Sequence, residues 1–312
     1  MSGARERATV FAPASVGNVA IGFDILGFAL AAVGDRVTVA RRSAPGVQIS
    51  AVRGIAGALP HEARDNTAGR ALLAMGEALH LDFGFSVEID KGIPLGSGLG
   101  GSAASAVGAV VAANALLPAP RSPLELLQFA MAGEAVASGA RHADNIAPSL
   151  FGGLVLTVGI DHPRVKQIPV PQSVRAVVVH PHMFLATAKA RAILNSSVEL
   201  SDFVWQTANL AGFISGCYTN DLEMIRASFQ DVVIEPQRAA LIPGFQEVRR
   251  AAMRAGALGC SISGAGPSMF AWALEADAPE VLKAMRCEFT RHSLATDEWV
   301  VPLHSPGARL LE

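Results

Sequence analysis

The sequence predicts a globular protein of two lobes that contain both helices and strands. Its 312 residues exceed the size at which one hydrophobic core usually stops growing, about 250 to 300 residues. Hydrophobic residues make up 51% of the chain and charged residues 17%, which favours a compact, well-buried enzyme over a disordered protein. A polar, proline-rich stretch at residues 160–172 predicts the boundary, with lobes at residues 1–165 and 166–312.

Composition argues against several classes of partner. The net charge is −2, with basic and acidic residues interspersed, so neither nucleic acid nor an anionic membrane surface is expected to bind. The longest apolar runs are shorter than the roughly 20 residues of a membrane span, and residues 1–7 are too polar for a signal peptide. Three widely spaced cysteines argue against a disulfide framework and for a reducing, cytoplasmic location. A small-molecule substrate is the simplest expectation, and a homodimer is allowed but not required.

Local patterns predict the elements of the first lobe. Strands are expected at residues 9–14, 35–40, 47–52 and 83–90, with the second and third paired as a hairpin. Apolar residues at helical spacing predict a helix at residues 67–78, capped by Asp65 or Asn66. Runs of apolar and small residues predict two more helices, at residues 102–117 and 124–139. A polar loop at residues 141–153 then leads into a strand.

The second lobe is expected to begin with a buried strand near Val174. Helices are predicted at residues 187–194, 203–217 and 221–229, followed by a strand, a glycine turn and a strand within 259–272, and by a helix and a strand in the tail. His180 and His182 have the spacing of zinc ligands on a strand. No third ligand follows nearby, so a zinc site is not expected.

Residues 91–105, KGIPLGSGLGGSAAS, lie between a predicted strand and a predicted helix and have the character of a phosphate loop. Four glycines remove side chains where the backbone must bend and approach a ligand: Gly96, Gly98, Gly100 and Gly101. The following helix directs its unpaired N–H groups back at the loop, so an anion is predicted to bind there. Three serines offer hydroxyl groups: Ser97, Ser102 and Ser105. A side chain at Gly98 is expected to occupy the space that a phosphate needs.

Two common phosphate loops fail to match this stretch. Gly96, Gly98 and Gly101 have GxGxxG spacing, but a dinucleotide fold needs a strand ending in an acid about 20 residues later, where residues 121–129 predict a helix. A Walker loop needs a Lys after its last glycine, and none follows.

The pattern PLGSGLGGSAASA resembles the second motif of the GHMP kinases, a family of small-molecule kinases that use ATP. Many members carry two serines after GLG, and here the first is Gly101, so the resemblance leaves Ser102 as the hydroxyl for Mg²⁺. It also implies that Asn66 lies beside the adenine. The loop residues that it assigns to ATP binding are Pro94, Leu95, Gly96, Ser97, Gly98, Leu99, Gly100, Gly101, Ser102, Ala103, Ala104 and Ser105.

Residues 15–27, SVGNVAIGFDILG, place Asn18 and Asp24 in apolar company. A buried, unpaired charge costs several kcal/mol, so Asp24 either caps the turn that follows or holds a ligand. The run FAPASVGNVAIGFDILGFAL resembles the first motif of the family members that act on L-homoserine. That resemblance implies that Asn18 and Asp24 contact the amino-acid substrate.

Further family-like segments carry the remaining candidates. Glu134 lies in an apolar helix, where the alternatives are a solvated side chain and, as the resemblance implies, a Mg²⁺ ligand shared with Ser102. The segment RHADNIAPSLFGG places Asp144 and Asn145 beside the site, and residues 259–272 resemble the third family motif, which borders the phosphates.

Two segments of the second lobe, TAKARAIL and EPQRAALIPGF, also resemble the family. Thr187 is expected to cap a helix that carries Arg191 one turn later. Arg191 and Arg238 match the family arginines that hold the substrate carboxylate; the alternative for each is a surface arginine.

The resemblance implies an α+β fold with the two lobes of the GHMP kinases: an N-terminal lobe similar to the second domain of a small-subunit ribosomal protein and a ferredoxin-like C-terminal lobe, with ATP between them. It implies ATP-dependent phosphorylation of the L-homoserine hydroxyl to O-phospho-L-homoserine, in threonine biosynthesis. Two alternatives stay open, a kinase for another small molecule such as mevalonate and a non-catalytic nucleotide-binding regulator. The proton acceptor is also open: Asp144 matches the family base, whereas Asp24 is expected to orient the hydroxyl in a mechanism without a strong base.

Overall fold

The computed structural model describes residues 5–55, 59–138 and 142–311. Within them, the first sheet has seven strands, five of which follow the order β11-β1-β2-β4-β3. The other two lie off this path: β5 pairs with β2, and β6 pairs with β5. Its strands are β1 (Arg7–Gly17), β2 (Leu26–Arg42), β3 (Gly46–Gly54), β4 (Gly84–Lys91), β5 (Leu154–Val158), β6 (Arg164–Ile168) and β11 (Arg309–Leu311). The second sheet has the order β10-β7-β9-β8 and consists of β7 (Val174–Pro181), β8 (Gly259–Ile262), β9 (Met269–Leu274) and β10 (Thr296–Pro302).

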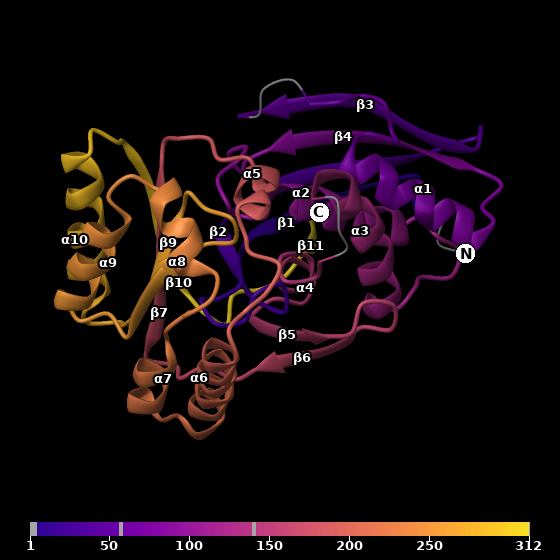
Figure 1. The fold of residues 1–312 in the computed structure, drawn as a ribbon. Coiled ribbons are helices and arrows are strands. Elements are labelled where there is room, and N and C mark those ends of the chain that lie inside the picture. The colour runs from indigo at the N-terminus through magenta and orange to yellow at the C-terminus, as the bar shows by residue number, and fades with distance from the viewer. Residues whose placement is uncertain (1–4, 56–58, 139–141, 312) are drawn as a thin grey trace.

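Helices cover both sheets (Figure 1). The first lobe contains α1 (Thr67–Leu79), α2 (Gly101–Asn114), α3 (Pro123–Ser138) and α4 (Ile146–Phe151). The second contains α5 (Thr187–Ala192), α6 (Leu200–Thr219), α7 (Leu222–Ser228), α8 (Glu235–Arg238), the short 3₁₀ helix η1 (Ala239–Leu241), α9 (Phe245–Arg254) and α10 (Ala278–Arg291). In the part of the chain that the structure describes, none of these helices has the length and apolar character of a membrane span.

Successive side chains of β7 point alternately into two hydrophobic cores, one within the second lobe and one that continues into the first lobe. Val177 and Val179 pack beneath α9 and α10, whereas Ala176 and Val178 face the opposite way into the large core of the first lobe. Phe28 of β2 meets Phe270 of β9 there, with ring centroids 5.6 Å apart. The two lobes therefore share one hydrophobic core.

The predicted hairpin at residues 35–52 is wrong. β3 pairs with β4 in parallel, and β4 lies between β2 and β3. The connection from β3 to β4 contains α1, and a helical crossover of this kind joins parallel strands. The short link between β2 and β3 suggested a hairpin. The link instead crosses over the position of β4, which lies between these two strands in the sheet although it comes later in the chain.

Three further segments differ from the sequence prediction. Residues 160–172, expected as a linker, contain β6, which pairs with β5. Residues 141–153, expected as a loop, contain the short helix α4, and α9 was not foreseen. The lobe boundary between residues 165 and 166 stays a prediction; it falls within β6, and β11 returns from the C-terminal end to pair with β1.

Candidate functional site

The glycine loop joins β4 to α2 and bends through left-handed backbone conformations. Gly96, Gly98 and Gly100 have φ values of 62°, 77° and 66°, a region that side-chain-bearing residues rarely adopt. A Cβ atom on Gly98 would lie 2.5 Å from the carbonyl oxygen of Ser263 and 2.6 Å from that of Gly266. A side chain at Gly98 was expected to enter the space of a phosphate and to leave the fold largely intact. The structure corrects the second part, because the side chain would displace the backbone of the turn in the second lobe.

That turn, residues 263–268, holds the first and second motifs together. The Ser263 hydroxyl donates to the Gly98 carbonyl at 2.7 Å, and the Ser268 N–H donates to the Ser97 carbonyl at 3.1 Å. On its other side, the Gly264 N–H donates to the Gly17 carbonyl at 3.1 Å. The three glycine-rich segments, far apart in the chain, thus form one hydrogen-bonded unit across the two lobes.

A cavity of about 480 Å³ opens along the glycine loop. The predicted loop residues line it except Ala103 and Ala104, which belong to the first turn of α2 and are buried in the hydrophobic core. Asn66 forms part of the wall and caps α1, where its side-chain oxygen accepts from the N–H groups of Ala68 and Gly69 at 3.0 and 3.3 Å. The capping role is confirmed, and the cavity has the position expected for a nucleotide.

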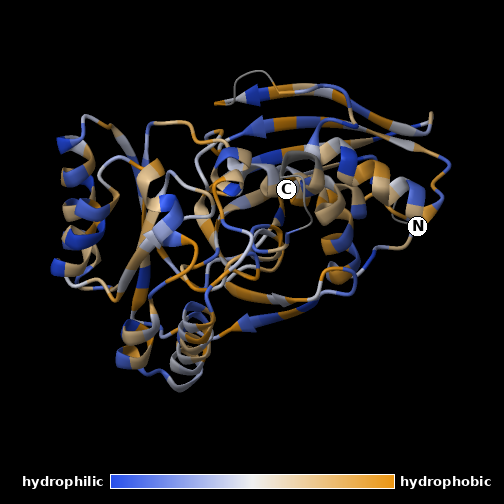
Figure 2. Cartoon of the chain, viewed as in Figure 1, coloured by the Kyte–Doolittle hydropathy of each residue, from blue (hydrophilic) through white to orange (hydrophobic). Residues whose placement is uncertain are grey.

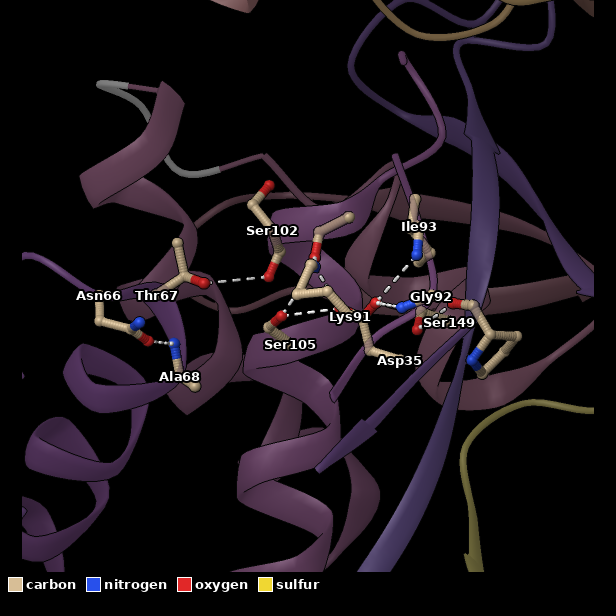
Figure 3. A network of polar contacts seen from close by, with 12 residues as sticks. Asp35, Asn66, Thr67, Ala68, Lys91, Gly92, Ile93, Ser102, Ser105 and Ser149 are labelled. Atoms are coloured by element: carbon tan, nitrogen blue, oxygen red, sulfur yellow. Dashed lines mark hydrogen bonds and ion pairs between the residues drawn. The ribbon is translucent and has the colours of Figure 1, made fainter. Parts of the chain in front are cut away.

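A buried ion pair lies beneath the loop (Figure 3). The Lys91 ammonium bonds the Asp35 carboxylate and also donates to the Gly101 carbonyl at 2.7 Å. Ser105 donates to the same carboxylate at 2.7 Å, and the N–H groups of Gly92 and Ile93 donate to its other oxygen at 3.1 and 3.3 Å. Ser105 was predicted to bind ATP, but its hydroxyl group donates its hydrogen bond to Asp35.

Ser102 and Glu134 meet across the start of α2 and the middle of α3. The Ser102 hydroxyl donates to a Glu134 carboxylate oxygen at 3.0 Å, and both residues line the cavity along the glycine loop. Burial raises the pKa of Glu134 to about 7, against the opposing effect of the Ser102 hydrogen bond. The expected proximity of this hydroxyl and this carboxylate is therefore present.

Oxygen donors of this kind suit Mg²⁺, which prefers few protein ligands and completes its octahedron with water and phosphate oxygens. Among the described residues, no group of three or more His, Cys, Asp and Glu side chains could hold a metal by itself. Ser102 and Glu134 fit a metal that arrives with a nucleotide, because they face the cavity together.

A smaller pocket of about 50 Å³ lies beside the cavity of the glycine loop, at the first motif. Arg191 of α5 forms two bonds to Asp24, at 2.7 and 3.2 Å, and His142 Nδ1 lies 3.2 Å from a carboxylate oxygen of the same residue. Asn18 accepts the Asp24 N–H at 3.0 Å, and both residues have positive φ. Asp24 is therefore an ion-paired pocket residue rather than a helix cap.

Arg238 approaches the same pocket from α8 but is held differently. It is 3% exposed, and it donates to the carbonyls of Ala190 and Gly264 at 3.1 Å each. The guanidinium carbons of Arg238 and Arg191 each lie 5.2 Å from the centroid of the Phe23 ring. The structure thus brings the two predicted arginines together, which excludes the alternative that Arg238 is a surface residue.

Asp144 and Asn145 close the pocket at the start of α4. The Asn145 amide donates to Asp144 at 3.0 Å and its oxygen accepts the Ser15 hydroxyl at 3.0 Å. Burial, and then the nearby charge of Asp24, raise the pKa of Asp144 to about 7. A carboxylate with this pKa accepts a proton readily near neutral pH.

The two cavities meet along one wall. Glu134, Asn145 and Thr187 line both, together with Gly264 and Ala265 of the third motif. A phosphate at the glycine loop and a small polar ligand beside Asp24 would therefore face each other across a few side chains. This arrangement suits the transfer of a phosphoryl group between two bound molecules.

Known proteins share both the sequence and this layout. A profile described as GHMP kinases N terminal domain matches residues 66–153, and one described as GHMP kinases C terminal matches residues 213–291. A homoserine kinase of Xylella fastidiosa (strain M12) is 52% identical over 311 residues, covering 98% of this chain and 94% of its own length. The chain belongs to the GHMP kinase family.

Two other members of this family are also similar over their whole length. A homoserine kinase of Chloroherpeton thalassium (strain ATCC 35110 / GB-78) is 44% identical over 318 residues, covering 98% of this GHMP kinase and 100% of its own length. The crystal structure of homoserine kinase from Cytophaga hutchinsonii has 42% identity and a TM-score of 0.94, covering 100% of this chain and 99% of that one. The predicted α+β GHMP kinase fold is confirmed, and use of ATP follows from the family.

Several site residues of this GHMP kinase were not found from its sequence. Asp35 and Lys91 were not recognised as a pair, and His142 was noted only as part of a polar loop. Thr187 was expected to cap α5, but the cap position is Ala186, which makes no side-chain bond. A signal for the ion pair was present in the sequence, because Lys91 is one of only four lysines and directly precedes the glycine loop.

Proposed function

We propose that this chain transfers the γ-phosphoryl group of ATP to the side-chain hydroxyl of L-homoserine, giving ADP and O-phospho-L-homoserine for threonine biosynthesis. The observation that carries the proposal is the shared wall of the two cavities, where Glu134, Asn145 and Thr187 stand between the glycine loop and the Asp24 pocket. The homoserine kinases among its relatives support the same acceptor.

The charges of the smaller pocket complement an amino acid. Arg191 and Arg238 offer guanidinium groups for a carboxylate, and Asp24 offers a carboxylate for an ammonium group. Mevalonate and galactose carry no ammonium group, so they would leave Asp24 without a ligand partner. This pairing favours homoserine over the acceptors of other family members.

Catalysis then rests on placement and charge. Asn18, Asp24 and the arginines orient the acceptor, and the glycine loop and the N-terminus of α2 receive the phosphates. Ser102 and Glu134 would hold Mg²⁺, which neutralises phosphate charge when it is bound with ATP.

The proton of the acceptor hydroxyl has two candidate destinations. Asp24 already binds Arg191 and lies beside His142, which suits it to orientation. Asp144 is buried in the same pocket, and its pKa of about 7 suits it to accept a proton. We therefore assign Asp144 as the proton acceptor and Asp24 as a positioning residue, in a reaction whose loose transition state needs little help from a base.

The direct test is a coupled ADP-release assay with L-homoserine, mevalonate and galactose as acceptors. We expect ADP release with homoserine alone, and a ³¹P signal for a phosphomonoester in the product. Release of ADP with mevalonate or galactose but not with homoserine would show that homoserine is not the acceptor. ATP binding without ADP release for any of the three would favour the non-catalytic regulator instead.

A further inference from the structure

Residues 182–186 link β7 to α5 and run from the second lobe to the glycine loop (Figure 1). Backbone hydrogen bonds hold this link at both ends. The His182 N–H donates to the Ala295 carbonyl at 2.8 Å, and the Leu185 N–H donates to the Gly96 carbonyl at 3.0 Å. The link therefore has a defined position against the first lobe, at the place where the glycine loop begins.

The link is apolar after His182, and Figure 2 shows hydrophobic residues along it. Leu185 anchors it, because this side chain is 5% exposed and packs with Ala190 and Ala265. Phe184 is not part of this cluster. It is 67% exposed, the largest exposed fraction of any Phe, Trp or Tyr that the structure describes. Attachment of the link therefore does not explain the presence of Phe184.

Gly96 determines where the Phe184 ring lies. A Cβ atom on Gly96 would lie 2.3 Å from Phe184 Cδ2 and 2.5 Å from Phe184 Cε2, so the ring packs directly against the backbone of the glycine loop. The rest of the ring borders the cavity of about 480 Å³. An exposed aromatic ring on a cavity wall offers an apolar surface that is open to a ligand.

A nucleoside triphosphate has two parts with different requirements. Its phosphates need hydrogen-bond donors, which the glycine loop and the N-terminus of α2 supply. Its base is a flat ring system whose faces pack on aromatic and apolar side chains. Phe184 packs on Gly96, at the start of the glycine loop and before the chain enters α2 at Gly101. Apolar residues of the first lobe border the same cavity: Leu59, Pro60, Ile89 and Leu95.

We propose that Phe184 packs on the base of bound ATP and makes the second lobe part of the base-binding site. The contact would hold the purine against the apolar residues of the first lobe while the glycine loop holds the phosphates. The role is specific to the base, because the face of an aromatic ring carries partial negative charge and does not attract a phosphate. This inference rests on the use of ATP in the proposed function and is independent of the acceptor.

Isothermal titration without an acceptor tests the contact. The ligands are ATP and tripolyphosphate, each with Mg²⁺; tripolyphosphate keeps three phosphates but lacks the base and the ribose. Phe184→Ala should weaken ATP binding about tenfold, the size expected when a base loses an aromatic partner, and should change tripolyphosphate binding by less than about twofold. The matched control is Phe203→Ala, because Phe203 is 60% exposed but lies on α6 and lines neither cavity. This control should bind both ligands as the wild type does.

Two outcomes of the titration would overturn the proposal. Unchanged ATP binding by Phe184→Ala would show that the ring does not contact the nucleotide. Equal losses for ATP and tripolyphosphate would show that the substitution distorts the glycine loop instead of removing a contact with the base. Thermal unfolding of Phe184→Ala should occur near the wild-type temperature, because Leu185 anchors the link.

Tryptophan fluorescence provides a second readout. Phe184→Trp should keep the ATP affinity of the wild type, since an indole ring also stacks on a base. ATP should quench the fluorescence that this variant has in excess of the wild type, and tripolyphosphate should not. ATP binding without this quenching would contradict stacking at position 184. A wild type that binds no ATP would overturn the proposed function together with this inference, whereas ATP binding that is independent of residue 184 would overturn the inference alone.

Discussion

Two ion pairs near the glycine loop have similar chemistry and different surroundings. Asp35 and Lys91 have side-chain exposures of 0% and 2%, and protein groups accept or donate to both carboxylate oxygens and to the ammonium. Asp24 and Arg191 are 24% and 33% exposed and border a pocket, and Arg191 Nε has no hydrogen-bond partner among the described residues. The first pair is complete within the protein, whereas the second has capacity left for a ligand.

This difference assigns the two pairs to different tasks. A buried, fully bonded pair specifies the local structure, since removing one partner leaves an uncompensated charge. Lys91 donates to the Gly101 carbonyl at the start of α2, so it positions the glycine loop, the proposed phosphate site. The open pair can exchange its internal bonds for bonds to the carboxylate and ammonium of an amino acid.

The largest effect is expected from breaking the closed pair. Lys91→Met removes the cation and leaves Asp35 buried without its counter-charge, which should lower the free energy of unfolding by about 3 to 5 kcal/mol. Urea unfolding followed by circular dichroism measures the change. Lys283→Met is the control, because the Lys283–Glu280 pair is 62% and 71% exposed and should contribute less than about 1 kcal/mol. A Lys91 variant as stable as this control would contradict the structural role.

In the pocket, Asp144→Asn should reduce turnover by about 100-fold while leaving measurable activity, because a general base contributes roughly 10² to 10⁴ and the transition state is loose. The decisive measurement is the pH profile of kcat. The wild-type rate should fall as pH drops below about 7, the pKa of Asp144, and the variant should lose that dependence on this group. Asp24→Asn should retain it, since Asp24 positions the acceptor. Complete inactivity of Asp144→Asn, with both substrates still bound, would make Asp144 an obligatory base.

The pKa values of about 7 also predict the pH dependence of stability. Asp144 and Glu134 bind protons more tightly in the folded state than in the unfolded state, where carboxyl pKa values are near 4. Their contribution to stability therefore falls as pH rises from about 4 to 7 and is constant above that. The side chain at position 144 of Asp144→Asn cannot ionise. The difference in free energy of unfolding between this variant and the wild type should therefore shift in favour of the variant by on the order of 2 kcal/mol from pH 5 to pH 8.

Guanidinium denaturation at several pH values provides the measurement. Glu134→Gln should show the same trend for the same reason, and the exposed Glu77→Gln should not. Parallel curves for the wild type and both pocket variants would show that these two carboxyl groups ionise normally in the folded protein.

The smallest change in stability is expected from the open pair. Arg191→Lys keeps the charge but loses the paired N–H geometry, so the KM for homoserine should rise about tenfold while the free energy of unfolding changes by less than about 1 kcal/mol. Arg238→Lys should raise the KM and also destabilise the fold, because Arg238 bonds two carbonyls in the core. Steady-state kinetics with urea unfolding of both variants measures the contrast. An unchanged KM in both would show that the substrate carboxylate binds elsewhere.

Much of this layout follows from local signals in the sequence. Regular apolar spacing identified α1, long runs of apolar and small residues identified α2 and α3, and glycine density identified the loop, because all three signals depend on residues close together in the chain. The short helix α4 and strand β6 have too few residues to show a period. The partner of β3 could not be predicted from its neighbours, since β4 enters the sheet after a helical crossover.

The closed pair, Asp35 and Lys91, can be predicted only when the register between strands β2 and β4 is known. Asp35 and Lys91 are 56 residues apart, and no local pattern connects them. Once β2 and β4 are paired with Arg36 opposite Asp90, Asp35 falls opposite Lys91. The ion pair of Asp24 with Arg191 spans 167 residues and both lobes, so resemblance to the family could bring these residues to one site but could not show that they bond each other.

Recognition of the acceptor requires that the open pair, Asp24 and Arg191, binds it as a zwitterion. Isothermal titration can compare L-homoserine with its carboxamide, which keeps the hydroxyl and the ammonium group but lacks the carboxylate charge, in the wild type and in Arg191→Lys. The wild type should bind the acid at least tenfold more tightly than the amide, and Arg191→Lys should lose most of that preference. Equal preference in the two proteins would contradict the claim, because the carboxylate would then be recognised without Arg191.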